Sequence, residues 1–125
     1  MKNPPTKLHE LLALALTDHD TIAKNPRYEI DMNYWHVPKG KTTCNVCLAG
    51  CVMVNSLDAV HNQLFYPNDF SAAWSAALMI LNDLREGRLG RGLPKVYPVT
   101  LHHHNRTQWR IDMQHLLEYL QLQDL

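Results

Sequence analysis

The amino-acid sequence predicts a helix-dominated α+β fold, with four or five helices around a central buried helix and a small two-stranded element. Several stretches repeat apolar residues at the spacing of one helix face. One stretch alternates apolar and polar residues, as a half-buried strand does. The chain of 125 residues is 46% hydrophobic and 19% charged, which is an ordinary globular composition. Its length suits one domain, so we expect residues 1–125 to form a single domain.

The first predicted helix begins near Leu8 and ends before Asn25-Pro26, because proline disfavours helical geometry in the residue before it. The polar run Thr17–Thr21 is a candidate break in this helix. Acidic and amide side chains then alternate with four apolar residues, Tyr28, Ile30, Met32 and Tyr34. This alternation predicts a half-buried strand. A turn is expected at residues 38–41.

The central helix is predicted over Cys44–Leu57, capped by Thr42 or Thr43, because this stretch is apolar around almost its whole circumference. Gly50 lowers helix stability by about 1 kcal/mol relative to alanine. We expect the close approach of another backbone to compensate for this cost.

Two further helices are predicted towards the C-terminus. Phe70 to Leu84 carries the clearest apolar stripe, and the last helix is capped by Asn105 or Thr107. Between them, Val96–Leu101 is a candidate second strand, restricted to a sheet edge by its proline.

The bulk composition narrows the function classes. Twelve basic residues balance twelve acidic ones, whereas nucleic-acid binders usually carry excess basic charge. No apolar run is long enough to cross a bilayer, and the N-terminus has no apolar signal core. We therefore expect a cytoplasmic protein with no membrane association and reduced cysteines.

Cys44 and Cys47 have the spacing of zinc ligands, and His102 and His104 could complete a tetrahedral site. The same residues, with Asn105, could instead form a cysteine hydrolase set, in which a helix N-terminus activates a thiol. However, cysteine packs readily as a small buried hydrophobe. We favour core thiols and expect no cofactor, with zinc as an alternative.

Two surface features are candidate binding sites. Arginine and glycine alternate over 85–92, and the basic residues Arg85, Arg88, Arg91 and Lys95 could hold a nucleic-acid backbone. The alternative is a solvated helix end whose basic residues complement the helix dipole. Trp35, His36 and Tyr66 lie beside predicted turns, so we expect them to be exposed and available to a protein partner. Trp74 and Trp109 lie on apolar stripes and are expected in the core.

The stretch from Trp35 to Gly50 contains Cys44-Asn45-Val46-Cys47-Leu48-Ala49-Gly50. It resembles small uncharacterised proteins of bacteriophages and prophages that carry a Cys-x-Val-Cys-Leu-Ala-Gly core. The resemblance implies a phage-borne accessory protein that binds a host or defence protein rather than acting as an enzyme. The wide apolar faces of the first and last helices also leave room for a homodimer.

Overall fold

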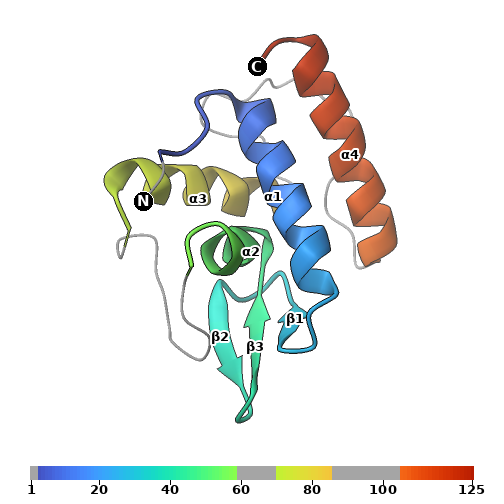
Figure 1. The fold of residues 1–125 in the computed structure, drawn as a ribbon. Coiled ribbons are helices and arrows are strands. Elements are labelled where there is room, and N and C mark those ends of the chain that lie inside the picture. The colour runs from blue at the N-terminus through green and yellow to red at the C-terminus, as the bar shows by residue number, and fades with distance from the viewer. Residues whose placement is uncertain (1–2, 59–69, 86–104) are drawn as a thin grey trace.

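The computed structural model describes residues 3–58, 70–85 and 105–125 (Figure 1). Within these ranges a helix-dominated α+β fold is confirmed. The helices are α1 (Leu8–Ala23), α2 (Leu48–Asn55), α3 (Ala72–Arg85) and α4 (Arg106–Leu122), and the strands are β1 (Tyr28–Ile30), β2 (His36–Lys39) and β3 (Thr43–Val46).

The sheet has three strands in the order β1-β3-β2, rather than the two strands expected. β1 runs parallel to β3, and β2 pairs antiparallel to β3. The predicted strand at Tyr28–Tyr34 stops at Ile30, because the backbone turns at Asp31: its carbonyl accepts from the Tyr34 N–H and its side chain accepts from the Asn33 N–H. The candidate strand Val96–Leu101 lies outside the described residues.

The predicted start of the cysteine-containing helix is wrong. Thr43–Val46 forms strand β3, and the helix begins only at Leu48. Its N-cap is therefore Cys47, not Thr42 or Thr43, and the Cys47 Sγ accepts a hydrogen bond from the Gly50 N–H at 3.4 Å. A short apolar run fits a buried strand and a buried helix equally well by periodicity. Pairing with β1 and β2 decides for the strand.

The predicted close approach of another backbone to Gly50 is confirmed. A Cβ built on this residue would lie 1.8 Å from the carbonyl oxygen of Trp35. No side chain fits in that space, so the missing side chain lets α2 contact the backbone of the segment entering β2.

Helix α1 is continuous through Thr17–Thr21, so the candidate break there is wrong. It contacts α2, α3, α4 and β1, and Figure 1 shows it beside α4. At its start, the Leu8 N–H donates to the carbonyl oxygen of Leu125 at 2.6 Å. The side chains of Lys7 and Asp124 form an ion pair at the same place.

The apolar core lies between the helices. Trp74 and Trp109 are buried there, as expected. Asn105 is the N-cap of α4, one of the two caps expected. The largest fully buried apolar side chains are those of Leu12, Leu16, Leu48, Met53, Leu78, Leu81, Leu84, Met113, Leu116 and Leu120. Among the described helices, none is long and apolar enough to cross a membrane.

Candidate functional site

The three cysteines occupy three different structural positions. Cys44 lies in β3, Cys47 caps α2 and Cys51 lies within α2. All three side chains are fully buried, and all three are free thiols. Burial raises the pKa of the Cys51 thiol well above its ordinary value, which opposes formation of the reactive thiolate. Because the helix starts at Leu48, Cys44 is not in its first turn and is not placed to be activated by the helix N-terminus.

Several residues of the expected sites lie outside the described ranges, namely Tyr66, Arg88, Arg91, Lys95, His102 and His104. Arg85 is the last residue of α3. Asn105 uses its side-chain Oδ1 to accept from the N–H groups of Thr107 and Gln108. In the described part of the chain no three acidic, cysteine or histidine side chains are grouped to hold a metal. The zinc, hydrolase and nucleic-acid sites stay predictions.

The expected exposure of the aromatic segment is wrong in part. His36 is fully buried, because β2 places it opposite Val46 on β3, at the edge of the core. Trp35 is half-buried, and its carbonyl faces Gly50. Among the aromatic residues that the structure describes, the exposed one is instead Tyr34, with 42% of its surface accessible.

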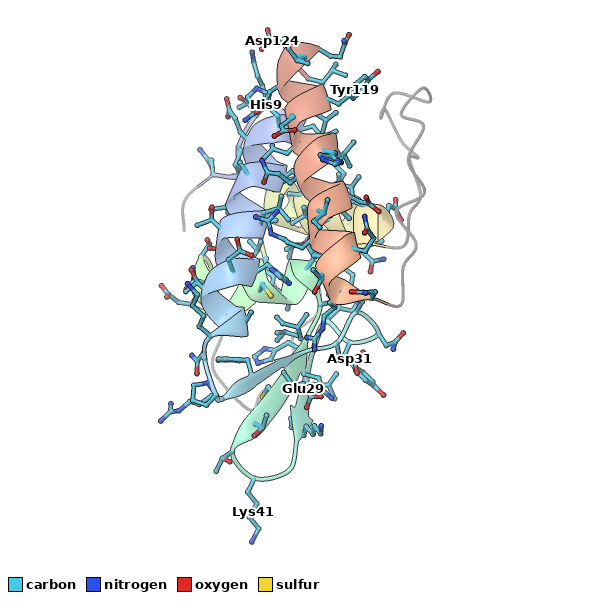
Figure 2. All side chains as sticks on the ribbon, turned by 90° about the vertical axis from the view of Figure 1, so that its right-hand side faces the viewer. His9, Glu29, Asp31, Lys41, Tyr119 and Asp124 are labelled. Atoms are coloured by element: carbon cyan, nitrogen blue, oxygen red, sulfur yellow. The ribbon has the colours of Figure 1, made fainter. Side chains whose placement is uncertain are left out.

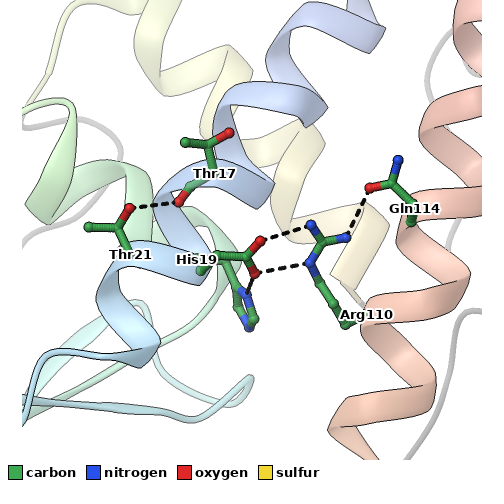
Figure 3. Close-up of polar contacts among 6 residues, drawn as sticks. Thr17, His19, Thr21, Arg110 and Gln114 are labelled. Atoms are coloured by element: carbon green, nitrogen blue, oxygen red, sulfur yellow. Dashed lines mark hydrogen bonds and ion pairs between the residues drawn. The ribbon is translucent and has the colours of Figure 1, made fainter.

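A charged network that the sequence did not predict joins α1 to α4. Arg110 binds Asp20 through two parallel hydrogen bonds, of 2.9 Å from Nη2 and 3.0 Å from Nε (Figure 3). Its Nη1 also donates to the Gln114 side chain at 3.2 Å. This guanidinium lowers the pKa of Asp20 to about 2, so the carboxylate is ionised at neutral pH.

His19 lies beside this ion pair. Its Nδ1 is 3.0 Å from Asp20 Oδ1, and because Asp20 is ionised we assign the proton to Nδ1 (Figure 3). Its Nε2 is buried and has no hydrogen-bond partner in the described part of the chain. The imidazole packs against Trp109, with ring centroids 5.2 Å apart. Burial lowers the pKa of His19, which keeps the ring neutral at neutral pH.

An aspartate that orients a histidine is also found in catalytic triads. Here the acceptor nitrogen, Nε2 of His19, is closed off from solvent, so no substrate reaches it in this arrangement. The geometry therefore supports a structural role, in which the network fixes α4 against α1.

Asp18 lies two residues before Asp20 but contacts α2. It is 2% exposed, and it accepts hydrogen bonds from Asn55 Nδ2 at 2.6 Å and from Ser56 Oγ at 2.5 Å. Burial raises the pKa of this carboxyl, while the two hydrogen bonds partly oppose that shift. Within the described ranges, no basic side chain forms an ion pair with it.

The sequence contained one signal for this network. Successive residues of a helix point about 100° apart, so a polar run such as Thr17–Thr21 can face two neighbouring elements at once. Asp18 and Asp20 do so here, towards α2 and α4.

Comparisons with known proteins do not extend this picture. No protein-family model matches the chain, and neither the curated proteins nor the solved structures contain a match.

Proposed function

We propose that this chain is a small cytoplasmic accessory protein, borne by a phage, that acts by binding a host or defence protein rather than by catalysis. The phage origin rests on the resemblance of the segment Cys44–Gly50. The binding role is supported by an exposed surface on α4. The burial of all three cysteines also favours it over a thiol-centred reaction.

The proposed docking surface, called here the α4 face, consists of Ile111, His115, Glu118 and Leu122. All four are exposed, and they follow one another at helical spacing on the side of α4 opposite its buried residues. Ile111 is 44% exposed and Leu122 is 84% exposed, both high for large apolar side chains. Exposed apolar side chains with polar ones beside them are typical of protein-binding sites.

Two contacts on its inner side hold α4, and with it the α4 face, in place. The Arg106 Nη1 donates to the carbonyl oxygen of Ile30 at 3.0 Å, which ties the start of α4 to the end of β1. One helical turn further on, Arg110 is fixed by Asp20 of α1. A surface that is ordered before binding loses less conformational entropy on binding, so these contacts favour affinity.

The test is a capture experiment with host lysate followed by reconstitution with the purified partner. We compare the wild-type chain, the double variant Ile111→Glu/Leu122→Glu, and a control variant Lys41→Ala at the tip of the β2–β3 hairpin (Figure 2). The expected result is one partner that binds the wild type and the control and binds the double variant at least about tenfold more weakly.

Equal binding by all three chains would contradict the role of the α4 face. Turnover of a substrate from a hydrolase panel, lost on Cys47→Ser, would contradict the binding function itself. Light scattering on the wild type alone tests whether the face instead pairs with a second copy of the chain.

A further inference from the structure

A cavity of about 390 Å³ lies away from the α4 face, where the N-terminal segment meets α1, α2 and α3. It is lined by Asn3, Pro5, Leu14, Asn55, Ser56 and Trp74. Its volume falls in the range of small-molecule sites, about 300–1,000 Å³. Most of its lining is apolar, and its polar side chains are that of Asn3 in the N-terminal segment and those of Asn55 and Ser56 at the end of α2.

The hydrogen bonds to Asp18 determine which donors and acceptors Asn55 and Ser56 can still offer a ligand. The Ser56 hydroxyl donates its only proton to Asp18, so its oxygen can only accept further bonds. The Asn55 amide uses one N–H for Asp18 and keeps its other N–H as a donor and its carbonyl Oδ1 as an acceptor. This end of the cavity therefore offers two acceptor oxygens, one on Asn55 and one on Ser56, beside a single amide donor.

The charges around the cavity also favour a cationic ligand. Asp18 is a buried carboxyl whose hydrogen-bond partners, Asn55 and Ser56, are both neutral. The cavity also lies at the C-terminal end of α2, where Ser56 is the C-cap and the last carbonyls of a helix carry partial negative charge. A cationic group in the cavity would be attracted by both.

We propose that this cavity binds a small organic ammonium ion, whose N–H groups donate to Asn55 and Ser56 and whose apolar body packs against Leu14, Pro5 and Trp74. The indole ring of Trp74 suits an aliphatic or aromatic body and attracts a nearby cation through its π face. A neutral alcohol of the same shape keeps the apolar contacts but loses the attraction to Asp18. A carboxylate is repelled.

The proposal is tested by titration calorimetry with three probes of similar size: 2-phenylethylammonium, 2-phenylethanol and 3-phenylpropanoate. The expected order is tightest binding for the ammonium ion, at least about tenfold weaker binding for the alcohol, and no binding for the carboxylate. Equal affinity for the ammonium ion and the alcohol, or no heat from the ammonium ion up to about 10 mM, overturns the proposal.

Three variants assign the binding to this cavity. Asp18→Asn removes the charge, and we expect it to weaken ammonium binding about tenfold. Asp20→Asn removes a carboxylate of the same helix that faces α4 instead, so it serves as the matched control and should bind as the wild type does. Leu14→Trp fills the cavity without changing any charge and should abolish binding. Circular dichroism establishes that each variant is folded.

If Asp18→Asn does not fold, Ser56→Ala replaces it. This variant removes one acceptor from the cavity and one of the two hydrogen bonds to Asp18, and we expect it to weaken ammonium binding. Binding that survives Leu14→Trp, or that falls equally in Asp18→Asn and Asp20→Asn, places the ammonium ion elsewhere and overturns the proposal.

A pH series adds an independent readout. Because the pKa of Asp18 is raised, protonation in mild acid removes its charge and should weaken ammonium binding.

Discussion

Where α2 meets the sheet, the contacts are made by backbone atoms and apolar side chains, whereas the contact between α1 and α4 adds a carboxylate, an imidazole and a guanidinium to its apolar side chains. Gly50 lies against the Trp35 carbonyl in the first region, with the buried Cys51 one residue further along α2. Asp20 and Arg110 form the ion pair of the second. The first region therefore depends on shape and should be insensitive to salt and pH. The second depends on charge and should respond to both.

The largest effect is expected for the thiols of the shape-dependent region. We predict that Cys44, Cys47 and Cys51 react with a thiol reagent about 1,000-fold more slowly in the native chain than in the unfolded one, because reaction requires opening of the core. Absorbance of the released chromophore measures the rate. A fast-reacting thiol in native protein would place a reactive cysteine at the surface. Acceleration by a zinc chelator would instead point to a metal on these thiols.

Gly50→Ala should be the most destabilising small substitution. Its Cβ would overlap the Trp35 carbonyl oxygen, which is backbone and cannot move aside, so we expect a loss of about 3 kcal/mol in the free energy of unfolding. Gly40→Ala is the control: nothing lies within 4 Å of its Cβ, and only its positive φ of 75° costs about 1 kcal/mol. Urea denaturation measures both. Equal losses would mean that the contact with Trp35 is unimportant.

The acid limb of the stability profile tests the charged region. The pKa of Asp20 is about 2 in the folded chain against 3.8 ordinarily, so its ionised form stabilises the fold. This contribution is present above pH 4 and is lost as the pH falls through about 2. Asp20→Asn should flatten this part of the profile by no more than about 1 kcal/mol, because the side chain is half-exposed and water screens it. An unchanged acid limb would mean that the ion pair does not contribute.

His19 and Asp18 should act in opposite directions in weaker acid. The folded chain disfavours protonated His19, so stability falls as the pH drops below about 6.5, and His19→Gln should remove this slope. The raised pKa of Asp18 means that its ionisation destabilises the fold, so its contribution improves as the pH falls towards 3.8. Thermal unfolding of His19→Gln and Asp18→Asn across this range separates the two. Parallel profiles would contradict the opposite signs.

The smallest effect is expected for Arg110→Lys. Lysine keeps the charge but cannot form the two parallel hydrogen bonds to Asp20, so we predict a loss of about 0.5 kcal/mol. Adding salt should reduce the difference from the wild type, as measured by urea denaturation at two ionic strengths. A salt-independent difference would indicate lost packing rather than lost electrostatics.

The two regions also differ in how far the sequence could predict them. Gly50 within an apolar stretch indicated a close backbone contact, and the stripe of α3 and the cap at Asn105 were correct because those signals are local. Strand β3 was missed because its identity depends on pairing with two strands from earlier in the chain. Periodicity within Thr43–Val46 carries no information about those partners.

The charged network was missed for a related reason. Asp20 and Arg110 are 90 residues apart, and each alone has the appearance of an ordinary surface residue. The predicted sites were built on more conspicuous residues, and three of these, Cys44, Cys47 and His36, are fully buried. A residue type indicates what chemistry is available, whereas the fold decides whether solvent and a ligand can reach it.

The hydrogen bond between the Leu8 N–H and the Leu125 carbonyl has a consequence for synthesis on the ribosome. Leu8 leaves the ribosome long before Leu125 is translated, so the first turn of α1 lacks this partner while the chain grows. The side chains of Lys7 and Asp124, 117 residues apart, meet only at the same late stage. Helix α1 can therefore pack against α2 and α3 while the chain grows, but its contact with α4 and this hydrogen bond form only after translation has passed α4.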